Sequence, residues 1–279
     1  MSSLAAFRGM TFKPGSRPRR FGALCAAALA VGTGGAACAP VPPTTATVAT
    51  PMMAAPPRWR AGFEGGDLSE WTYLLNPRGL SVVEGPAAAG RRAGRVEILP
   101  TDLWPNGLNR VEVQHKPPPE TMADGQRSCF AWRFLVPAAL SDDRHQIGYW
   151  ESYPSYRQIM SFEVRGQAIA FVTRLPGERV QWQAAGLITP GVWHQIGLCA
   201  RWSADPARGA VDVWFDGQRV VSGGRARTLW DNPNLVQLGI LRDRAVSPPE
   251  VMFLDDALEG SSLDAAGIPG AAAGSSNDG

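Results

Sequence analysis

The sequence is poor in several residue types that common enzyme chemistries require. Its 279 residues include three histidines, none at the spacing of a metal-binding motif, and only one lysine, Lys116, lies beyond residue 38. A transition-metal site is therefore not expected. We expect His194 to have a packing role, His145 to lie at a groove rim or in a solvated loop, and His115 to carry no chemistry. Helical periodicity is almost absent, which excludes a helical domain.

The charge of the chain gives no support to nucleic-acid binding. Of 27 basic residues, five lie in residues 1–38, which contain no acidic residue, so the remainder has 22 basic and 25 acidic side chains. A slightly acidic domain lacks the electrostatic footprint of a nucleic-acid-binding protein. We therefore expect no nucleic-acid partner.

Residues 1–38 have the pattern of an export signal. The basic "RPRR" precedes the apolar "FGALCAAALAVGTGGAAC", which is too short and too rich in glycine to span a membrane. Cys38 follows small residues, as in a bacterial lipoprotein cleavage site, and cleavage at an Ala-x-Ala-like site is the alternative. We expect an exported protein, either a surface lipoprotein whose only membrane contact is a lipid on Cys38, or a secreted or periplasmic protein.

Composition divides the rest of the chain into three parts. Residues 39–59 form a Pro/Thr/Ala-rich tether, and residues 263–279 have too little apolar mass to order themselves. Residues 60–262 have a suitable size for one β-sandwich, which we expect to be monomeric. Outside the leader and Cys38, only Cys129 and Cys199 remain, and we predict a disulfide between them, with two unpaired buried thiols as the alternative.

Residues 60–262 read as an all-β domain. Apolar and polar residues alternate in runs such as "RVEVQH" and "IMSFEVRG", and Gly, Pro and Asp separate these runs. Asp216-Gly217 predicts a tight hairpin turn, because this dipeptide tolerates positive φ. Many strands with long connections indicate a jelly-roll sandwich of two antiparallel sheets, one of them concave.

One short stretch is unusually rich in groups that contact sugars. Residues 148–158, "GYWESYPSYRQ", contain three of the four tyrosines of the chain together with a tryptophan, a glutamate and an arginine. Aromatic faces stack on pyranose rings, and carboxylates and guanidinium groups bind sugar hydroxyls. The stretch predicts a carbohydrate-binding surface.

Several segments occur in an order that resembles the heparin lyase I-like polysaccharide lyases. They include "FEGGDLSEW" (63–71), "NRVEV" (109–113), "LGILRD" (238–243), "FLDDALEG" (253–260) and, most specifically, "GVWHQIGLCARWSADPARGAVDVWFDGQRVV" (191–221). The resemblance covers about residues 61–260. It implies a concanavalin A-like jelly roll, an exported location and a polysaccharide that contains uronic acid.

The resemblance also implies three catalytic functions and shows where this chain departs from the family. Such a lyase neutralises the uronate carboxylate, removes the C5 proton and protonates the departing oxygen. The family's "R-x-E" strand is present as Arg110 with Glu112. Its "Q-W-H" strand aligns with Tyr149 and Glu151, and its "K-x-G-x-Y-R" strand places Gln237 and Leu241 where Lys and Tyr are expected.

We therefore predict that tyrosines of the 148–158 stretch replace the missing groups, with a pKa lowered by Arg110 or Arg157. The predicted catalytic residues are Arg110, Tyr149, Glu151 and Tyr156. The predicted substrate-binding residues are Glu112, Trp150, Tyr153, Arg157, Gln237 and Arg242. Carbohydrate binding without cleavage, or hydrolysis through Glu112, Glu151 or Glu163, are the alternatives.

Carboxylates near the two ends of the domain suggest a cation site. Glu64, Asp67, Asp255 and Asp256 resemble the oxygen donors of a structural Ca²⁺ in related jelly rolls, and ordinary surface carboxylates are the alternative. No cofactor is expected to be required for activity.

Overall fold

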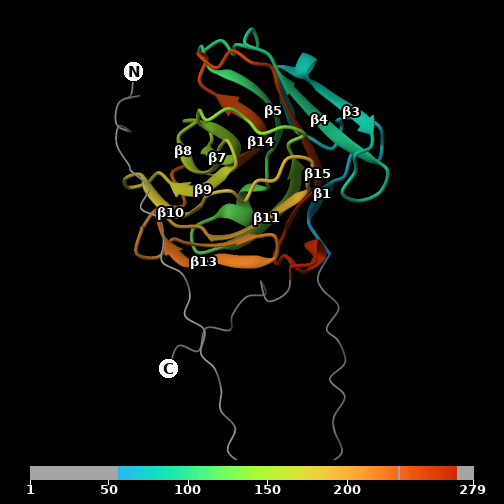
Figure 1. Ribbon diagram of the computed structural model, residues 1–279. Coiled ribbons are helices and arrows are strands. Elements are labelled where there is room, and N and C mark those ends of the chain that lie inside the picture. Colours follow the sequence, from blue (N-terminus) through green and yellow to red (C-terminus); the bar gives the residue numbers. More distant parts are fainter. Residues whose placement is uncertain (1–55, 232, 269–279) are drawn as a thin grey trace, which may run out of the picture. The chain divides into compact units, whose positions relative to one another are not determined.

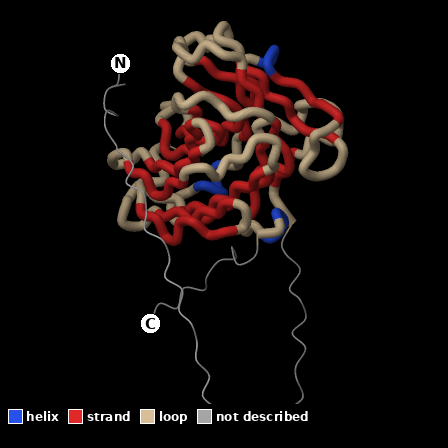
Figure 2. Tube along the Cα trace, in the orientation of Figure 1, coloured by secondary structure: helices blue, strands red, loops and turns tan. Residues whose placement is uncertain are grey.

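A computed structural model describes residues 56–231 and 233–268 of the chain. The predicted export signal, Cys38 and most of the predicted tether lie outside these residues, as does the chain beyond residue 268. The described part is built from two antiparallel β-sheets, with three short 3₁₀ helices in the connections (Figures 1 and 2). No helix in this part has the length and apolar character needed to cross a membrane.

The first sheet has eight strands and contains both ends of the described domain. Its spatial order is β13 (Gln218–Arg225), β12 (Ala210–Phe215), β11 (His194–Arg201), β6 (Arg127–Leu135), β15 (Glu250–Gly260), β4 (Arg92–Ile98) and β3 (Leu80–Glu84), with β1 (Trp59–Ala61) paired to β15. Strands β12 and β13 are joined by the predicted turn, in which Asp216 and Gly217 have φ of 47° and 76°. This prediction is confirmed.

The second sheet has seven strands and carries the sugar-binding stretch predicted from the sequence. Its order is β10 (Arg179–Ala184), β9 (Ala168–Thr173), β8 (Gln158–Arg165), β7 (His145–Ser152), β14 (Asn234–Arg242), β5 (Asn109–His115) and β2 (Tyr73–Leu75). The 3₁₀ helices are η1 (Pro77–Gly79), η2 (Pro119–Met122) and η3 (Asp264–Ala266). The predicted all-β sandwich of two antiparallel sheets is confirmed.

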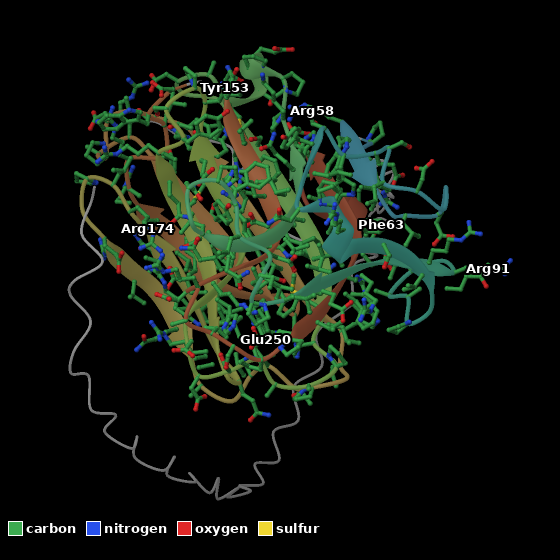
Figure 3. The ribbon with its side chains drawn as sticks, turned by 90° about the horizontal axis from the view of Figure 1, so that it is seen from above. Arg58, Phe63, Arg91, Tyr153, Arg174 and Glu250 are labelled. Carbon is green, nitrogen blue, oxygen red and sulfur yellow. A yellow bond between two sulfur atoms is a disulfide. The ribbon has the colours of Figure 1, made fainter. Side chains whose placement is uncertain are left out.

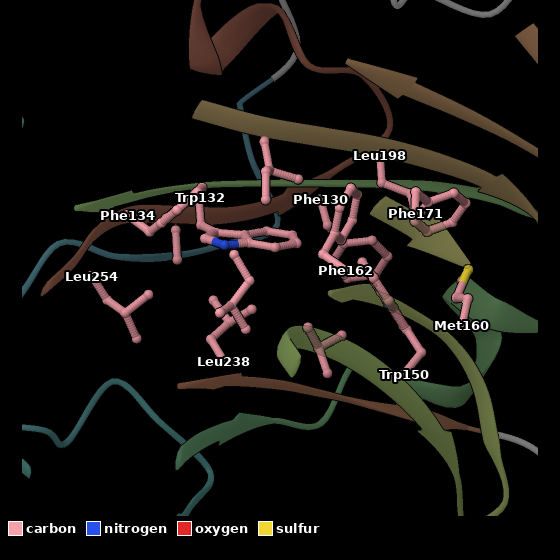
Figure 4. Packing of buried hydrophobic residues seen from close by; sticks show 14 of the residues in the cluster. Phe130, Trp132, Phe134, Trp150, Met160, Phe162, Phe171, Leu198, Leu238 and Leu254 are labelled. Atoms are coloured by element: carbon pink, nitrogen blue, oxygen red, sulfur yellow. The ribbon is translucent and has the colours of Figure 1, made fainter. Parts of the chain in front are cut away.

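Large aromatic side chains fill the space between the two sheets (Figure 4). Trp132 of β6 contacts Trp150 of β7 and Phe162 of β8, with ring centroids 6.0 and 5.5 Å apart. Gly148 makes this packing possible, because a Cβ there would lie 2.5 Å from the Trp132 ring. Trp150 is fully buried in this core. Its prediction as a substrate-binding residue is therefore wrong, because it faces the opposite side of β7 from Tyr149.

The predicted disulfide is confirmed and closes a second, smaller apolar cluster. Cys129 on β6 and Cys199 on β11 are direct cross-strand partners, with an S–S distance of 2.09 Å. Leu263 and Ile268 pack against this pair and are fully buried. The packed domain thus extends to residue 268, and the prediction that the chain ceases to be ordered at residue 263 is wrong for residues 263–268.

Candidate functional site

Five polar side chains come together on the face of the seven-stranded sheet that points away from the core. Strand β14 lies between β5 and β7, and it brings Gln237 between the β5 residues Arg110 and Glu112 and the β7 residues Tyr149 and Glu151. Successive residues of a strand alternate between faces, so Val111 and Val236, for example, enter the core instead. We call these five residues the Arg110 cluster. The predicted placement of Arg110, Glu112, Tyr149 and Glu151 on one face is confirmed.

Hydrogen bonds join all five members of the cluster. Arg110 donates through Nε to Glu112 Oε2 at 2.5 Å, and through Nη2 to Gln237 Oε1 at 2.5 Å and to the Tyr149 hydroxyl. The Tyr149 hydroxyl donates to Glu112 Oε2 at 3.1 Å. Gln237 Nε2 donates to Glu151 Oε2 at 2.7 Å. Gln237 therefore connects the cation of the cluster to the carboxylate at its other side.

Burial shifts the pKa of both carboxylates upward. It raises the pKa of Glu151 to about 7, because the nearby Glu112 adds to the burial and the attraction of Arg110 only partly offsets it. Burial also raises the pKa of Glu112, although Arg110 and Tyr149 both bond its charged form. A Glu with a pKa near neutrality can exchange a proton at physiological pH, as a general base must.

The pKa of Tyr149 moves in the direction opposite to the prediction. Its burial and the charges of Glu112 and Glu151 raise the pKa of the hydroxyl well above its ordinary value, and the opposing attraction of Arg110 is too small to reverse this. The expectation of a tyrosine activated by a lowered pKa is therefore wrong for Tyr149. A hydroxyl that stays protonated is suited to donating a proton rather than accepting one.

Most of the Arg110 cluster is inaccessible to solvent. Tyr149 is 0% exposed, Gln237 2% and Arg110 4%, whereas Glu151 is partly exposed. Among the described residues, none accepts a hydrogen bond from Nη1 of Arg110, and none donates one to the buried Oε1 of Glu112. Arg110 Nη1 and Glu112 Oε1 therefore have no hydrogen-bond partner among the described residues, and Glu151 forms the accessible side of the cluster.

A glycine and an irregularity in β14 shape the centre of the cluster. Gly239 lies opposite Glu112 with φ of 146°, and a Cβ there would lie 2.3 Å from the Val111 carbonyl oxygen. The register of β14 against β7 shifts between Leu238 and Leu241. Because of this shift, Leu241 lies opposite Arg110 on one side and Gln146 on the other, at the place where the resemblance expects a tyrosine.

The remaining residues of the tyrosine-rich stretch lie beyond the end of β7. Tyr153 and Tyr156 are exposed in the turn between β7 and β8, and their rings contact each other edge to face at 5.8 Å. Arg157 stacks over Trp230 at 4.3 Å. The structure thus separates Tyr156 from the hydrogen-bonded cluster, and its prediction as a catalytic residue of that cluster is not supported by any contact.

Arg242 belongs to a different cluster, buried between the sheets at the other end of β14. Its Nη1 donates to Glu250 Oε2 at 2.6 Å, and its Nε donates to Asn109 Oδ1 at 2.6 Å. His145, fully buried, contacts the same Glu250 oxygen through Nε2 at 2.7 Å. We call these four residues the Glu250 cluster. Arg242 points to the core side, so its prediction as a substrate-binding residue is wrong, as is the placement of His145 at a rim or in a solvated loop.

A further polar group on the outward face was not predicted. Arg174, which follows β9, forms ion pairs with Glu163 and Glu178 and donates to Gln158 at 2.8 Å. Gln146 and Gln158 also bond each other. Arg174 lies in a loop, where strand alternation gives no signal, and only its proximity to Glu163 in space reveals the group.

The carboxylates proposed for calcium mainly bind backbone amides. Glu64 accepts from the amides of residues 91 and 92 at 2.9 Å, and Asp255 accepts from those of residues 88 and 89 at 2.8 and 2.9 Å. Asp67 bonds Ser69, and Asp256 lies 3.6 Å from Arg60. No three His, Cys, Asp or Glu side chains gather as a metal site within the described residues. Calcium binding stays a prediction.

Comparison with solved structures shows which proteins share this architecture. An endo-β-1,4-glucuronan lyase from the fungus Trichoderma reesei matches with a TM-score of 0.59 and 15% identity, covering 75% of this chain and 97% of that one. The catalytic domain of a glycoside hydrolase family 131 protein from Coprinopsis cinerea matches with a TM-score of 0.53 and 16% identity, covering 74% and 94%. The cellulose induced protein Cip1 gives 0.51 and 11%, covering 73% and 97%. At these identities the matches show a shared fold.

Sequence comparison supplies the family. No curated protein matches the chain in sequence. The family model described as polysaccharide lyase matches residues 63–257, which include every strand from β2 to β14 and most of β15. The chain therefore belongs to the polysaccharide lyase family.

Proposed function

We propose that this protein is an exported polysaccharide lyase that cleaves a polysaccharide containing uronic acid by β-elimination. The observation that carries the proposal is the Arg110 cluster, in which a cation bonds a tyrosine hydroxyl directly and is joined through Gln237 to a carboxylate with a pKa of about 7. Family membership and the fold shared with a glucuronan lyase support the reaction class and a uronate substrate.

Each catalytic function has a residue in the cluster. The free Nη1 of Arg110 binds the substrate carboxylate, which stabilises negative charge developing at C5. Glu151, the accessible carboxylate, removes the C5 proton. The electron pair of the broken C–H bond forms the C4=C5 double bond, the C4–O bond breaks, and the glycosidic oxygen takes the proton of the Tyr149 hydroxyl. Gln237 orients Glu151 through the 2.7 Å hydrogen bond.

This arrangement differs from that of the heparin lyase I-like enzymes, which use His, Lys and Tyr at the aligned positions. Here Glu151 acts in place of His, and Tyr149 acts in place of the tyrosine that Leu241 replaces. A glutamate of ordinary pKa is a weak base for this proton, but a pKa of about 7 brings it close to that of histidine. The resemblance to that particular group of lyases stays a prediction.

Carbohydrate binding without cleavage is a second candidate, and a specific observation favours it. Tyr149 is completely buried, so a substrate reaches its hydroxyl only if covering side chains move. Exposed Tyr153 and Tyr156 would still offer ring faces to a sugar. Hydrolysis through Glu163 has less support, because Glu163 forms an ion pair with Arg174 outside the Arg110 cluster.

A direct test is to incubate the protein with several polyuronates and record ultraviolet absorbance. Elimination alone creates a conjugated unsaturated uronate, whereas hydrolysis creates only new reducing ends. Tyr149→Phe should reduce the rate of product formation by about 10² to 10⁴ with little change in affinity, because it removes only the transferable proton. Binding of polyuronates without unsaturated product from any of them would favour the non-catalytic candidate.

The cellular location and assembly are part of the same proposal. We infer export from residues 1–38, either with a lipid on Cys38 as the membrane anchor or with release of the cleaved chain, and a monomeric state. Membrane association that disappears in Cys38→Ala, and a mass in solution equal to that of one chain, would support these inferences. A structural calcium ion at the Glu64 and Asp255 region would raise the melting temperature on calcium addition, and an unchanged temperature would argue against it.

A further inference from the structure

A second group of sugar-binding side chains gathers at the end of the seven-stranded sheet next to Glu151. Tyr153 follows Glu151 by two residues, which is about 7 Å along an extended chain. Its amide donates to the carbonyl of Pro233 at 3.0 Å and so joins the β7–β8 turn to the segment before β14. Figure 3 shows Tyr153 and Glu250 at opposite ends of the domain. The turn therefore lies at the Glu151 end of the strands, away from the Glu250 cluster.

Two arginines from different segments share one tryptophan there. The guanidinium carbons of Arg157 and Arg227 lie 4.3 and 4.0 Å from the ring centre of Trp230, and Trp230 is 37% exposed. Stacking on a ring uses the face of a guanidinium and leaves its in-plane N–H groups for other partners. One of these groups, Nε of Arg227, donates a hydrogen bond to the Leu229 carbonyl. The Trp230 ring thus contacts two cations, and both guanidinium groups keep N–H groups for other partners.

A third cation and two tyrosines extend the group. Lys116 Nζ lies 4.3 Å from the ring centre of Tyr153, and Tyr153 and Tyr156 are 37% and 59% exposed. Within residues 56–231 and 233–268, no carboxylate forms an ion pair with Lys116, Arg157 or Arg227. This group of side chains therefore carries three positive charges that a bound anion would neutralise.

The turn that presents these groups is fixed by its own hydrogen bonds. Tyr156 has φ of 52°, a left-handed conformation that is uncommon for a bulky residue, and its amide donates to the Ser152 carbonyl at 2.7 Å. Ser152 accepts from the Arg157 amide at 3.2 Å and bonds Ser155 at 2.8 Å. A strained residue retained in a well-bonded turn points to a role for its side chain.

We propose that Lys116, Tyr153, Tyr156, Arg157, Arg227 and Trp230 form a separate binding subsite for an acidic polysaccharide. We call these six residues the rim subsite. Its guanidinium groups bind uronate carboxylates, and its exposed tyrosine rings stack on the sugar. The rim subsite favours a polysaccharide that carries carboxylates on further sugars, in addition to the uronate bound at the Arg110 cluster. The inference deepens the proposed function, because it names the substrate as a polyanion, but it requires binding only and not cleavage.

The test measures binding and cleavage separately on the full exported protein. The probes are a glucuronan oligomer and the same oligomer with its carboxyl groups reduced to alcohols. The variants are Arg157→Gln/Arg227→Gln, which removes charge and keeps length, and Arg91→Gln as a control, because Arg91 is an exposed arginine that lies away from Tyr153 in Figure 3. Binding is measured by calorimetry at two salt concentrations, and cleavage by ultraviolet absorbance.

The rim proposal predicts a loss of about tenfold or more in affinity for the glucuronan oligomer in the double variant, with a weaker salt dependence. Binding of the reduced oligomer should not change, and the control should bind like the wild type. Equal affinity in the double variant and the wild type would overturn the proposal. So would an equal loss in Arg91→Gln, or tighter binding of a DNA oligonucleotide of the same charge. If the affinity falls as predicted but neither the wild type nor any variant forms unsaturated product, the rim subsite is supported and the proposed lyase function is contradicted.

Discussion

The Arg110 cluster and the Glu250 cluster both draw residues from β5, β7 and β14 but lie on opposite faces of that sheet, and the pKa values of their carboxylates shift in opposite directions. Burial by itself would raise the pKa of Glu250, but hydrogen bonds from His145, the Ser141 amide and Arg242 lower it to about 2. In the Arg110 cluster, burial prevails and the pKa of Glu151 rises to about 7.

The difference lies in how many donors each carboxylate receives. Glu250 accepts from His145, Arg242 and the Ser141 amide at 2.6–2.8 Å. Glu151 accepts one hydrogen bond, from the neutral amide of Gln237. A fully bonded carboxylate is a fixed structural charge, whereas an underbonded one near a second carboxylate is free to take up a proton. The number of donors thus separates a structural cluster from a candidate catalytic one.

The largest expected effect comes from removing the proton acceptor of the Arg110 cluster. Glu151→Gln keeps the size of the side chain and its contact with Gln237 but cannot accept the C5 proton. We expect turnover to fall by about 10² to 10⁴, measured as formation of unsaturated product. Glu178→Gln serves as the control, because Glu178 pairs with Arg174 outside the cluster. Full activity in Glu151→Gln would remove Glu151 from the mechanism.

The next effect is a loss of stability in the Glu250 cluster. Glu250→Gln leaves the buried Arg242 without its counter-ion, which we expect to lower the free energy of unfolding by about 3–5 kcal/mol at pH 7. Because the folded pKa of Glu250 lies below its ordinary value of 4.5, its stabilisation is present above pH 4.5 and is lost as the pH falls toward 2. The difference in the free energy of unfolding between Glu250→Gln and the wild type, measured with urea, should therefore be smaller at pH 3 than at pH 7. An equal difference at both values would contradict this account.

The sequence predicted the fold and most of the Arg110 cluster, because strand alternation fixes which residues share a face. The same alternation places Trp150 on the core side once Tyr149 is assigned to the other face, so the pattern itself argues against a substrate contact for Trp150. Gly239 within "LGIL" is the kind of residue that often marks a bulge in a strand, but it does not specify the shift of register between Leu238 and Leu241. The sequence pattern does not point to Arg227 and Trp230, because they lie in an irregular segment that only folding brings to the β7–β8 turn.

The smallest expected effect is a gain of stability in Glu151→Gln, in contrast to the loss of stability expected for Glu250→Gln. The folded pKa of Glu151 lies above its ordinary value of 4.5, so the folded state binds the extra proton between about pH 4.5 and 7 and loses stability as the pH rises through that window. Above pH 7, the charged carboxylate of Glu151 lowers the free energy of unfolding by up to about 3 kcal/mol, and partial exposure of the side chain makes the actual loss smaller.

Glu151→Gln removes this loss of stability. We expect the variant to unfold at higher urea concentration than the wild type at pH 8 and at the same concentration at pH 4. Lower stability of the variant at pH 8 would mean that Glu151 is held as a bonded charge, like Glu250, and the two clusters would no longer differ in the way that makes one of them catalytic.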